Sequence, residues 1–488
     1  MLTRKPRGSM IAIGVGIAIA MAGACDQTAI APHVDADAAP ETPAAADGGP
    51  IDDGPANEAS GGGGGTNPAG GAGGGAGAGL PNGSMTGAAA IARSSGSLVV
   101  AGVLTGSVDL GKGSLTSAGG SDLVVAEFDQ AGSVTWNRRY GGAGDAGNAL
   151  VAVDVSGGTF VTTAFAGSLD LGAGALTSAG MSDVAVARLD ATGATTWSRR
   201  FGDAAAQFPV ALASDGAGGV LLGVHFATSA PNEGTSLLKL SSTGEPAWTK
   251  DWTDVEIRAL APTASDGTLV AGWFWRTVDF GGGPRTSAGL EDIFLLELDA
   301  AGTWIRDLQF GGSGSDRALG MAVDPGGDIF LTGAFDDTLA LGSPALVSPR
   351  DPSRFAASLD VFVAELRAGG TPVWSRRFGD ASSDQQGTSV AADGLGRVVV
   401  AGGVGGAIDF GLGSLDAATG PAFVALFDAA GQARWQTQLP ALPAMVRTTP
   451  AGALLLVGSF GADTTFDLQR GRTLKAGKDA FLVEVLLP

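Results

Sequence analysis

The chain contains 488 residues, of which 44% are hydrophobic, and it carries a formal net charge of −20. This acidic balance argues against nucleic acid and anionic lipid surfaces as partners, because phosphate recognition depends on Lys and Arg. The composition includes one cysteine and two histidines, which excludes an internal disulfide and argues against a zinc site or a Ser-His or Cys-His nucleophile system.

The N-terminal segment has the pattern of an export signal. Arg4, Lys5 and Arg7 precede an apolar run over residues 11–24, which is too short to span a membrane as a helix. Small residues then lead directly to Cys25, the only cysteine of the chain. This arrangement resembles the lipobox of bacterial lipoproteins, which implies a signal peptide over residues 1–24 and lipidation of Cys25. A plain secretory signal that happens to end near one cysteine is the alternative.

Residues 25–82 form the second predicted segment. Its first part is acidic and contains no Lys or Arg, and its second part, from Gly61 to Gly79, is almost entirely Gly and Ala. Such a composition offers too little apolar surface to offset the entropy of ordering the chain. We therefore predict a disordered tether between the anchor and a folded domain over residues 83–488.

The predicted domain contains an internal repeat, marked by a Gly-x₃-Trp motif with a period of roughly sixty residues. The motif occurs at Gly132/Trp136, Gly193/Trp197, Gly244/Trp248, Gly370/Trp374 and Gly431/Trp435. Such a repeat indicates units that bury their hydrophobic faces only against neighbouring units. Alignment on the motif divides the domain into about seven units.

Each unit reads as four short strands. In the second unit, β-branched and aromatic residues occupy 149–155, 159–165, 183–189 and 195–201, and turn residues separate these runs. Four strands per unit without helical periodicity predict an all-β fold, a seven-bladed β-propeller. The seventh unit lacks a Trp-bearing fourth strand, so we expect an incomplete last blade, three-stranded or completed weakly by the tether.

One column of the aligned units, near the end of the second strand, is almost entirely apolar. Its members are Leu104, Phe165, His225, Phe274, Phe335, Val404 and Phe460. We interpret this column as blade core. For His225 in this position, a buried, hydrogen-bonded histidine is favoured over a ligand or a base.

The stretches 183–190, 360–366 and 310–312 show the repeat most clearly, as Asp-Val-Ala-Val-Ala-Arg-Leu-Asp, Asp-Val-Phe-Val-Ala-Glu-Leu and Phe-Gly-Gly. In these stretches the chain resembles the SBBP-type repeats of bacterial surface proteins. The resemblance implies a β-propeller and a setting in the cell envelope, with no common activity. The Asp-x-x-Gly-x₃-Trp pattern is also similar to the tryptophan-docking motif of quinoprotein propellers.

Repeated charged residues accompany the strands. One aspartate column contains Asp122, Asp183, Asp292 and Asp479, and arginine pairs follow the motif tryptophans at 138–139, 199–200 and 376–377. Carboxylates gathered on one face would suit Ca²⁺. Hydrogen bonds from each aspartate to its own turn are favoured instead, because a repeated feature usually serves the fold. We therefore predict no metal or other cofactor, with Ca²⁺ as the open alternative, and structural arginines.

The units disagree most in three consecutive blades. Unit three has Pro231–Gly234 in place of the Asp-Leu-Gly loop, unit four has aromatic residues before Arg276, and unit five has an insertion at 343–358. Because Trp and Arg dominate recognition surfaces, we predict one ligand-contact patch. Its residues are Trp275, Arg276, Arg350 and Arg354. Ordinary drift of the repeats, with Trp273 and Trp275 filling core space, is the alternative.

These patterns favour a lipid-anchored propeller of the bacterial envelope, with the outer membrane or cell surface as its location. We expect a monomeric, non-catalytic binding or scaffold module that contacts a protein or a glycan at its loop face, and contacts the membrane only through the lipid. One alternative is a subunit of an envelope assembly complex. The other is an acid-pair or calcium-assisted enzyme.

Overall fold

The computed structural model describes most of residues 84–485. The described ranges are 17–18, 84–130, 133–227, 233–349, 358–393, 396–418, 420–439 and the strands within 443–485. None of these residues forms a helix, so they contain no helix able to cross a membrane. Cys25, the predicted tether, Arg350, Arg354 and Asp479 lie outside the described residues.

The described strands form four-stranded antiparallel sheets, which we number in chain order. Sheets one to three contain β2 (Ser84–Ala92), β3 (Leu98–Thr105), β6 (Asp122–Phe128) and β7 (Val134–Tyr140); β8 (Ala146–Val153), β9 (Thr159–Phe165), β12 (Asp183–Leu189) and β13 (Thr195–Phe201); and β14 (Ala206–Ser214), β15 (Val220–Ala227), β16 (Gly234–Leu240) and β17 (Pro246–Thr253).

Sheets four to six repeat this order. They contain β18 (Val255–Pro262), β19 (Thr268–Phe274), β22 (Asp292–Leu298) and β23 (Trp304–Phe310); β24 (Asp316–Val323), β25 (Ile329–Phe335), β28 (Asp360–Leu366) and β29 (Pro372–Phe378); and β30 (Gln385–Ala392), β31 (Val398–Val404), β34 (Ala422–Phe427) and β35 (Ala433–Leu439). In each sheet, strands that follow one another pair with one another, as hairpin turns require.

The seventh sheet differs from the prediction. It contains β36 (Pro443–Thr448), β37 (Leu454–Ser459) and β40 (Ala480–Val485), and its edge is occupied by the two-residue strand β1 (Ile17–Ala18). The expected three-stranded last blade is therefore corrected to four strands. The fourth strand comes from the predicted signal peptide, not the tether: Ile17 and Ala18 pair with Leu482 and Phe481 at the open edge of β40, and the predicted domain itself supplies the other three strands.

Small two-stranded ladders replace the long loop expected between the second and third strands. They are β4 (Ser107–Asp109) with β5 (Ser114–Thr116), β10 (Ser168–Asp170) with β11 (Ala175–Thr177), β20 (Thr277–Asp279) with β21 (Pro284–Thr286), β26 (Thr338–Leu339) with β27 (Leu346–Val347), β32 (Ala407–Asp409) with β33 (Ser414–Asp416), and β38 (Thr464–Asp467) with β39 (Thr473–Ala476). We call them the side hairpins.

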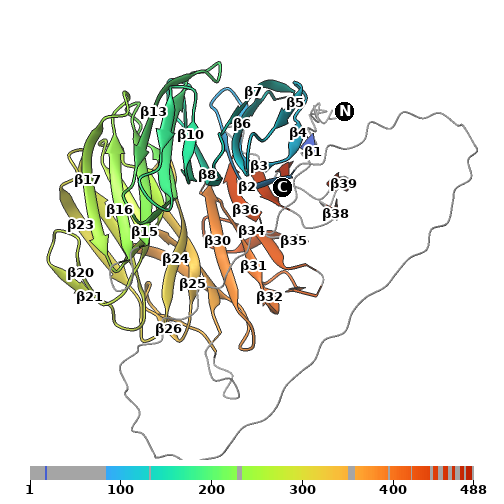
Figure 1. Ribbon diagram of the computed structural model, residues 1–488. Helices are drawn as coiled ribbons and strands as arrows, with labels where there is room; N and C mark the ends of the chain where they lie inside the picture. Colours follow the sequence, from blue (N-terminus) through green and yellow to red (C-terminus); the bar gives the residue numbers. More distant parts are fainter. Residues whose placement is uncertain are drawn as a thin grey trace, which may run out of the picture. The chain divides into compact units, whose positions relative to one another are not determined.

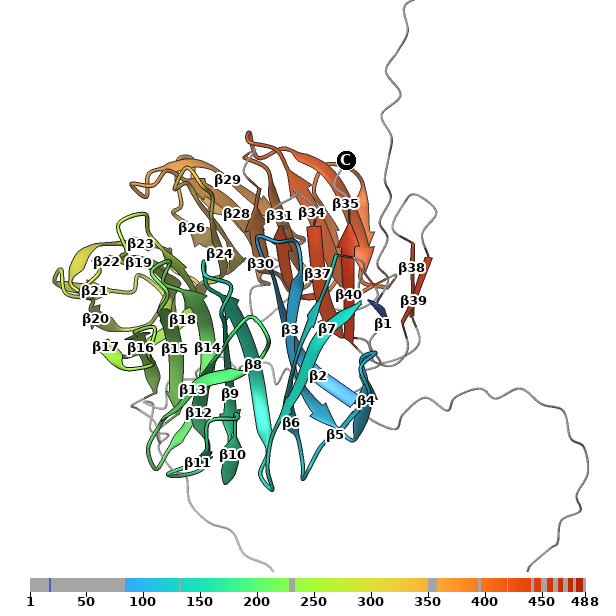
Figure 2. The ribbon, with the colours of Figure 1, turned by 90° about the horizontal axis from the view of Figure 1, so that it is seen from above.

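The sheets pack face to face in chain order. The first strand of each sheet contacts the first strand of the next, and β2 of sheet one contacts β36 and β37 of sheet seven. Figures 1 and 2 show this succession and the neighbouring first and last sheets. Successive four-stranded meanders that close on themselves form a β-propeller.

The core lies between the sheets. The strands β6, β9 and β25 are buried along their whole length, as expected for strands covered on both faces. The predicted apolar column is correct at Leu104, Phe165, Phe274 and Phe335, each at most 2% exposed.

The column assignment of His225 is wrong by one residue. Phe226, not His225, pairs with Gly234 in the way that Phe165 pairs with Asp183. Sheet three lacks the Asp-Leu-Gly loop from which the column was counted. His225 is half-buried, and its Nδ1 lies 2.9 Å from Oε2 of Glu256.

Candidate functional site

A tryptophan latch joins most neighbouring sheets. Trp136 packs on Gly193 of the next sheet, whose φ is +75°, and a Cβ there would lie 2.5 Å from the indole ring. The same packing joins Trp197 to Gly244, Trp248 to Gly302 and Trp374 to Gly431. Gly193, Gly244 and Gly431 each belong to the Gly-x₃-Trp motif of the following unit, and Gly302 holds the same position in unit four. Only a residue without Cβ permits this close approach.

A buried ion pair accompanies the latch in three sheets. Asp122, Asp183 and Asp360 open the third strands of sheets one, two and five, are fully buried, and bind Arg139, Arg200 and Arg377 of the fourth strands. The N···O distances are 2.5 Å for the first and last pairs. A backbone N–H from the preceding loop, that of Ala118 or Ala179, donates to the same carboxylate in sheets one and two.

The other arginine of each pair binds the next sheet. Arg138, Arg199 and Arg376 donate to the carbonyls of Thr192, Thr243 and Ala430, in the turns that carry the latch glycines. The repeated arginines are therefore structural, as predicted. Asp122 and Asp183 are bonded within their own sheets, and the described residues contain no group of three or more His, Cys, Asp or Glu placed to hold a metal ion.

The junction of sheets four and five departs from this pattern. In β23 the position of the latch tryptophan holds Arg306, and the arginine pair is replaced by Leu308 and Gln309. In β21, Arg285 takes the place of the leucine found at Leu115, Leu176 and Leu415 in other side hairpins. Asp292 opens β22 in the usual way and is 1% exposed.

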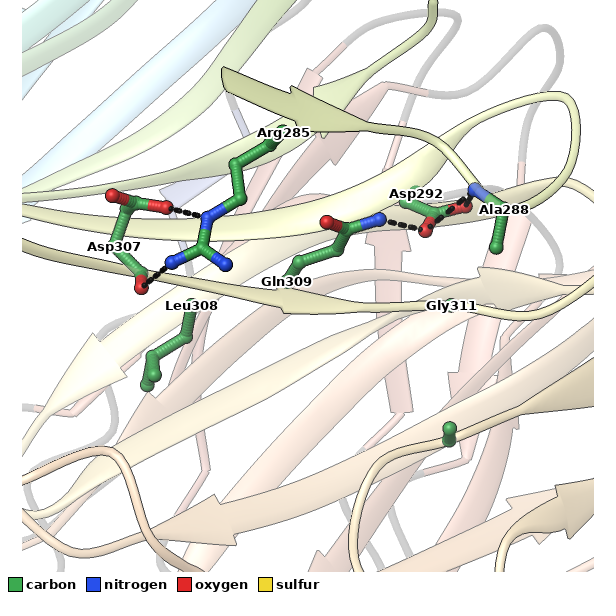
Figure 3. A pocket seen from close by; sticks show the side chains of 8 residues that line it. Arg285, Ala288, Asp292, Asp307, Leu308, Gln309 and Gly311 are labelled. Atoms are coloured by element: carbon green, nitrogen blue, oxygen red, sulfur yellow. Dashed lines mark hydrogen bonds and ion pairs between the residues drawn. The ribbon is translucent and has the colours of Figure 1, made fainter. Parts of the chain in front are cut away.

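These substitutions leave a cavity of about 420 Å³ at this junction. The residues that line it are Arg285, Ala288, Asp292, Asp307, Leu308, Gln309, Gly311 and Ala340. Figure 3 shows two hydrogen-bonded pairs of side chains on its wall. Arg285 Nε donates to Asp307 at 2.6 Å, and Gln309 Nε2 donates to Asp292 at 2.7 Å.

Acidic side chains predominate in and behind the cavity. Its two carboxylates face one guanidinium, so its lining carries an excess of one negative charge when all three groups are ionised. Behind it, burial raises the pKa of Asp316 to about 8, a hydrogen bond from Gly312 N–H opposes this shift, and the nearby Asp292, Asp336 and Glu291 add to it. Asp316 lies where Gln207 and Gln385 stand in sheets three and six.

Two exposed apolar side chains lie on β23, the strand that supplies three of the lining residues. Trp304 and Ile305 of β23 are 37% and 44% exposed. The Trp304 indole packs on Gly281 and Gly282 and donates from Nε1 to Asp307 Oδ1 at 2.6 Å. The same carboxylate group thus holds both Arg285 and Trp304, and β23 is the outer edge strand of its sheet.

A second cavity, of about 570 Å³, lies beside the latch of sheet two. Its lining includes Trp197, Arg199 and Ser242. Trp197 Nε1 donates to the carbonyl of Ser242 at 2.8 Å, and Arg199 pairs with Glu245 at 2.7 Å. Because these groups already serve the repeated latch, the junction of sheets four and five is the better candidate site.

The predicted patch is described only in part. Trp275 is half-buried, and its backbone N–H donates to Asp254. Arg276 is exposed, has a φ of +62° and lies 3.2 Å from Asp254. Its carbonyl accepts from Ser287, which precedes the cavity residue Ala288. The contribution of Arg350 and Arg354 stays a prediction.

Sequence reasoning located unit four but missed the cavity residues. It noted Trp275 and Arg276, whereas the cavity is built from Arg285, Asp307 and Gln309. The available signal was the absence before Phe310 of the Arg-Arg pair that units one, two and five carry at 138–139, 199–200 and 376–377.

No family model and no curated protein matches this chain. Similar solved structures include BamB from Moraxella catarrhalis, with 12% identity over 83% of this chain and 98% of that chain and a TM-score of 0.36. The Pan2 WD40 domain of Neurospora crassa has 12% identity over 83% and 89%, with a TM-score of 0.41. Streptogramin B lyase has 8% identity over 75% and 90%, with a TM-score of 0.38. These structures are β-propellers, and identities this low concern the fold alone.

Proposed function

We propose that this protein is a lipid-anchored, seven-bladed propeller of the bacterial envelope that binds a protein partner at the junction of sheets four and five. The observation that carries the proposal is the local loss of the repeat. One junction exchanges the latch tryptophan and both arginines and opens a cavity, and the strand that supplies Asp307, Leu308 and Gln309 to its lining also carries the exposed Trp304 and Ile305. Exposed aromatic and apolar residues around a polar pocket are typical of recognition surfaces.

A binding role is favoured over acid-pair hydrolysis for a specific reason. Hydrolysis by two carboxyl groups requires that both reach the substrate. Asp316 has the perturbed pKa of a catalytic acid, but it is fully buried and does not line the cavity. Asp307 lines the cavity, but it is committed to Arg285 and Trp304.

Site-specific photo-crosslinking in cells tests the proposed interface. A photoreactive residue at Ile305 should give a discrete adduct with a protein. The matched control is Val373, which holds the same register position in sheet five and is 41% exposed, against 44% for Ile305. Equal labelling at both positions, or none at Ile305, would contradict the proposed site.

The envelope setting requires its own experiment. Protease treatment of intact cells should release fragments of the domain if the protein lies on the cell surface, and Cys25→Ala should shift it into the medium or periplasm. Complete protection until the outer membrane is opened would instead favour a subunit of a periplasmic assembly complex.

A further inference from the structure

The three intact ion pairs show what normally occupies the space beside the buried aspartate. In sheets one, two and five this space holds a guanidinium group, from Arg139, Arg200 or Arg377. Each of these arginine side chains is about one-third exposed, at 30%, 33% and 29%. The guanidinium therefore enters from the solvent side and reaches a carboxylate that is itself fully buried.

Sheet four keeps the buried acceptor, but its side-chain donor is a neutral amide in place of a guanidinium. Asp292 is as buried as its counterparts, and the loop N–H of Ala288 lies 3.2 Å from both of its oxygens, as the N–H of Ala118 serves Asp122. Gln309 reaches the carboxylate only with a neutral amide. A buried carboxylate without a cation is costly, and a charged donor would stabilise it more than an amide does.

The cavity also has walls that suit an arginine side chain. Leu308 and Ala340 offer apolar contact for the aliphatic part, and Gly311 packs directly on Asp292, where a Cβ would lie 2.4 Å from its carboxyl carbon. The one cation already present, Arg285, is held by Asp307 at 2.6 Å. The charge of Asp292 is thus left for a ligand.

We propose that this cavity binds the guanidinium group of an arginine side chain, presented by the partner protein, against Asp292. The inference rests on the proposed function and specifies the chemistry of the partner. A guanidinium is planar and presents several N–H donors, so it can bond a carboxylate while its stem lies along apolar side chains. The ligand thereby restores, between two molecules, the ion pair that the other sheets make within one chain.

Ligand-observed saturation-transfer NMR on the full chain tests the inference with capped amino acids. N-acetyl-arginine N′-methylamide should bind at least about tenfold more tightly than its citrulline analogue, which has the same shape and no charge, a ratio that corresponds to roughly 1.4 kcal/mol. Equal signals from arginine and citrulline, or from arginine and lysine, would overturn the assignment of a guanidinium site. Tighter binding of free arginine than of the capped form would overturn a peptide source.

Two variants locate the site. Gln309→Arg introduces the residue that sheets one, two and five have at this position, so it should fill the cavity from within, abolish arginine binding and melt at or above the temperature of wild type. Asp292→Asn should also lose binding, and Gln438→Arg, at the same position of sheet six, where no aspartate opens the third strand, is the matched control and should bind like wild type. Undiminished binding by Gln309→Arg would overturn the location.

The two proposals fail separately. Crosslinks at Ile305 together with no arginine binding would keep the interface and reject the guanidinium. Arginine binding lost in Gln309→Arg, without crosslinks at Ile305, would keep the guanidinium site and reject the protein interface around it.

Discussion

Replacement of Asp316 by Asn tests the charge balance behind the cavity. Asp316 is fully buried, its Oδ1 has no hydrogen-bond partner among the described residues, and burial raises its pKa to about 8 from an ordinary 3.8. Between these values the folded protein holds a proton that the unfolded chain has released. The contribution of this group is therefore fully present below pH 4 and is lost as the pH rises, by about 1.4 kcal/mol per pH unit.

The expected difference is large enough to measure. From pH 5 to pH 7, wild type should lose up to about 3 kcal/mol more unfolding free energy than Asp316→Asn, because the amide does not titrate. Urea unfolding of both proteins at pH 5, 6 and 7 gives this difference, in which most other titrations cancel. Asp316→Gln, which introduces the residue found at Gln207 and Gln385, should behave like the Asn variant. Parallel pH curves for wild type and both variants would refute the reasoning.

Three further predictions concern the repeat and its polar contacts. Gly193→Ala should destabilise the fold by about 2–4 kcal/mol more than Gly167→Ala. Both glycines have a φ near +75°, but the Cβ at 193 would lie 2.5 Å from the Trp136 ring, whereas the nearest atom to a Cβ at 167 is 3.8 Å away. Equal urea midpoints for the two variants would contradict the latch. Arg200→Met should cost about 2–4 kcal/mol by leaving Asp183 buried without its cation, and Asp183→Asn combined with it should recover part of that loss in the same urea assay. Burial lowers the pKa of His225, but the hydrogen bond and charge of Glu256 outweigh it and raise this pKa above the ordinary 6.5. The stabilising effect of the pair is therefore fully present below pH 6.5 and is lost as the pH rises through the raised pKa. Glu256→Gln should lower the pKa in an NMR titration of the imidazole, and an unchanged titration would rule out the pair.

The architecture was predictable because the same strand pattern recurs along the sequence. Every unit repeats strands of similar length, and the Gly-x₃-Trp spacing marks the fourth strand in most of them. The role of the glycine was not visible in one unit. Gly193 belongs to sheet two but serves Trp136 of sheet one, and a contact between residues 57 positions apart cannot be read from local spacing.

The candidate site was harder to predict because it is defined by the absence of the tryptophan and the arginines that other units carry at these positions. The sequence interpretation drew on Trp275 and Arg276, whereas the neighbouring Trp273 is core, as the alternative had it: it is 5% exposed and packs beneath Arg258 and Arg317, with ring-to-guanidinium distances of 5.0 and 5.7 Å. Gln309 is an ordinary polar residue in the sequence. Its role becomes visible only from the pairing of β23 with β22, which places it beside Asp292, at the position that holds arginine in sheets one, two and five.

The same junction shows how a repeat protein can acquire a site without losing its fold. Leu308 packs on Gly370 in place of a tryptophan, and Arg306 binds Glu297 and the carbonyl of Ala368, as the tryptophans of sheets one and five bind Glu127 and Glu365. These contacts keep sheets four and five together, so closing the junction does not require a side chain in the space beside Asp292. Because Leu308 and Arg306 make these contacts and Gln309 does not, substitutions at Gln309 can alter binding while Leu308 and Arg306 hold the sheets in place.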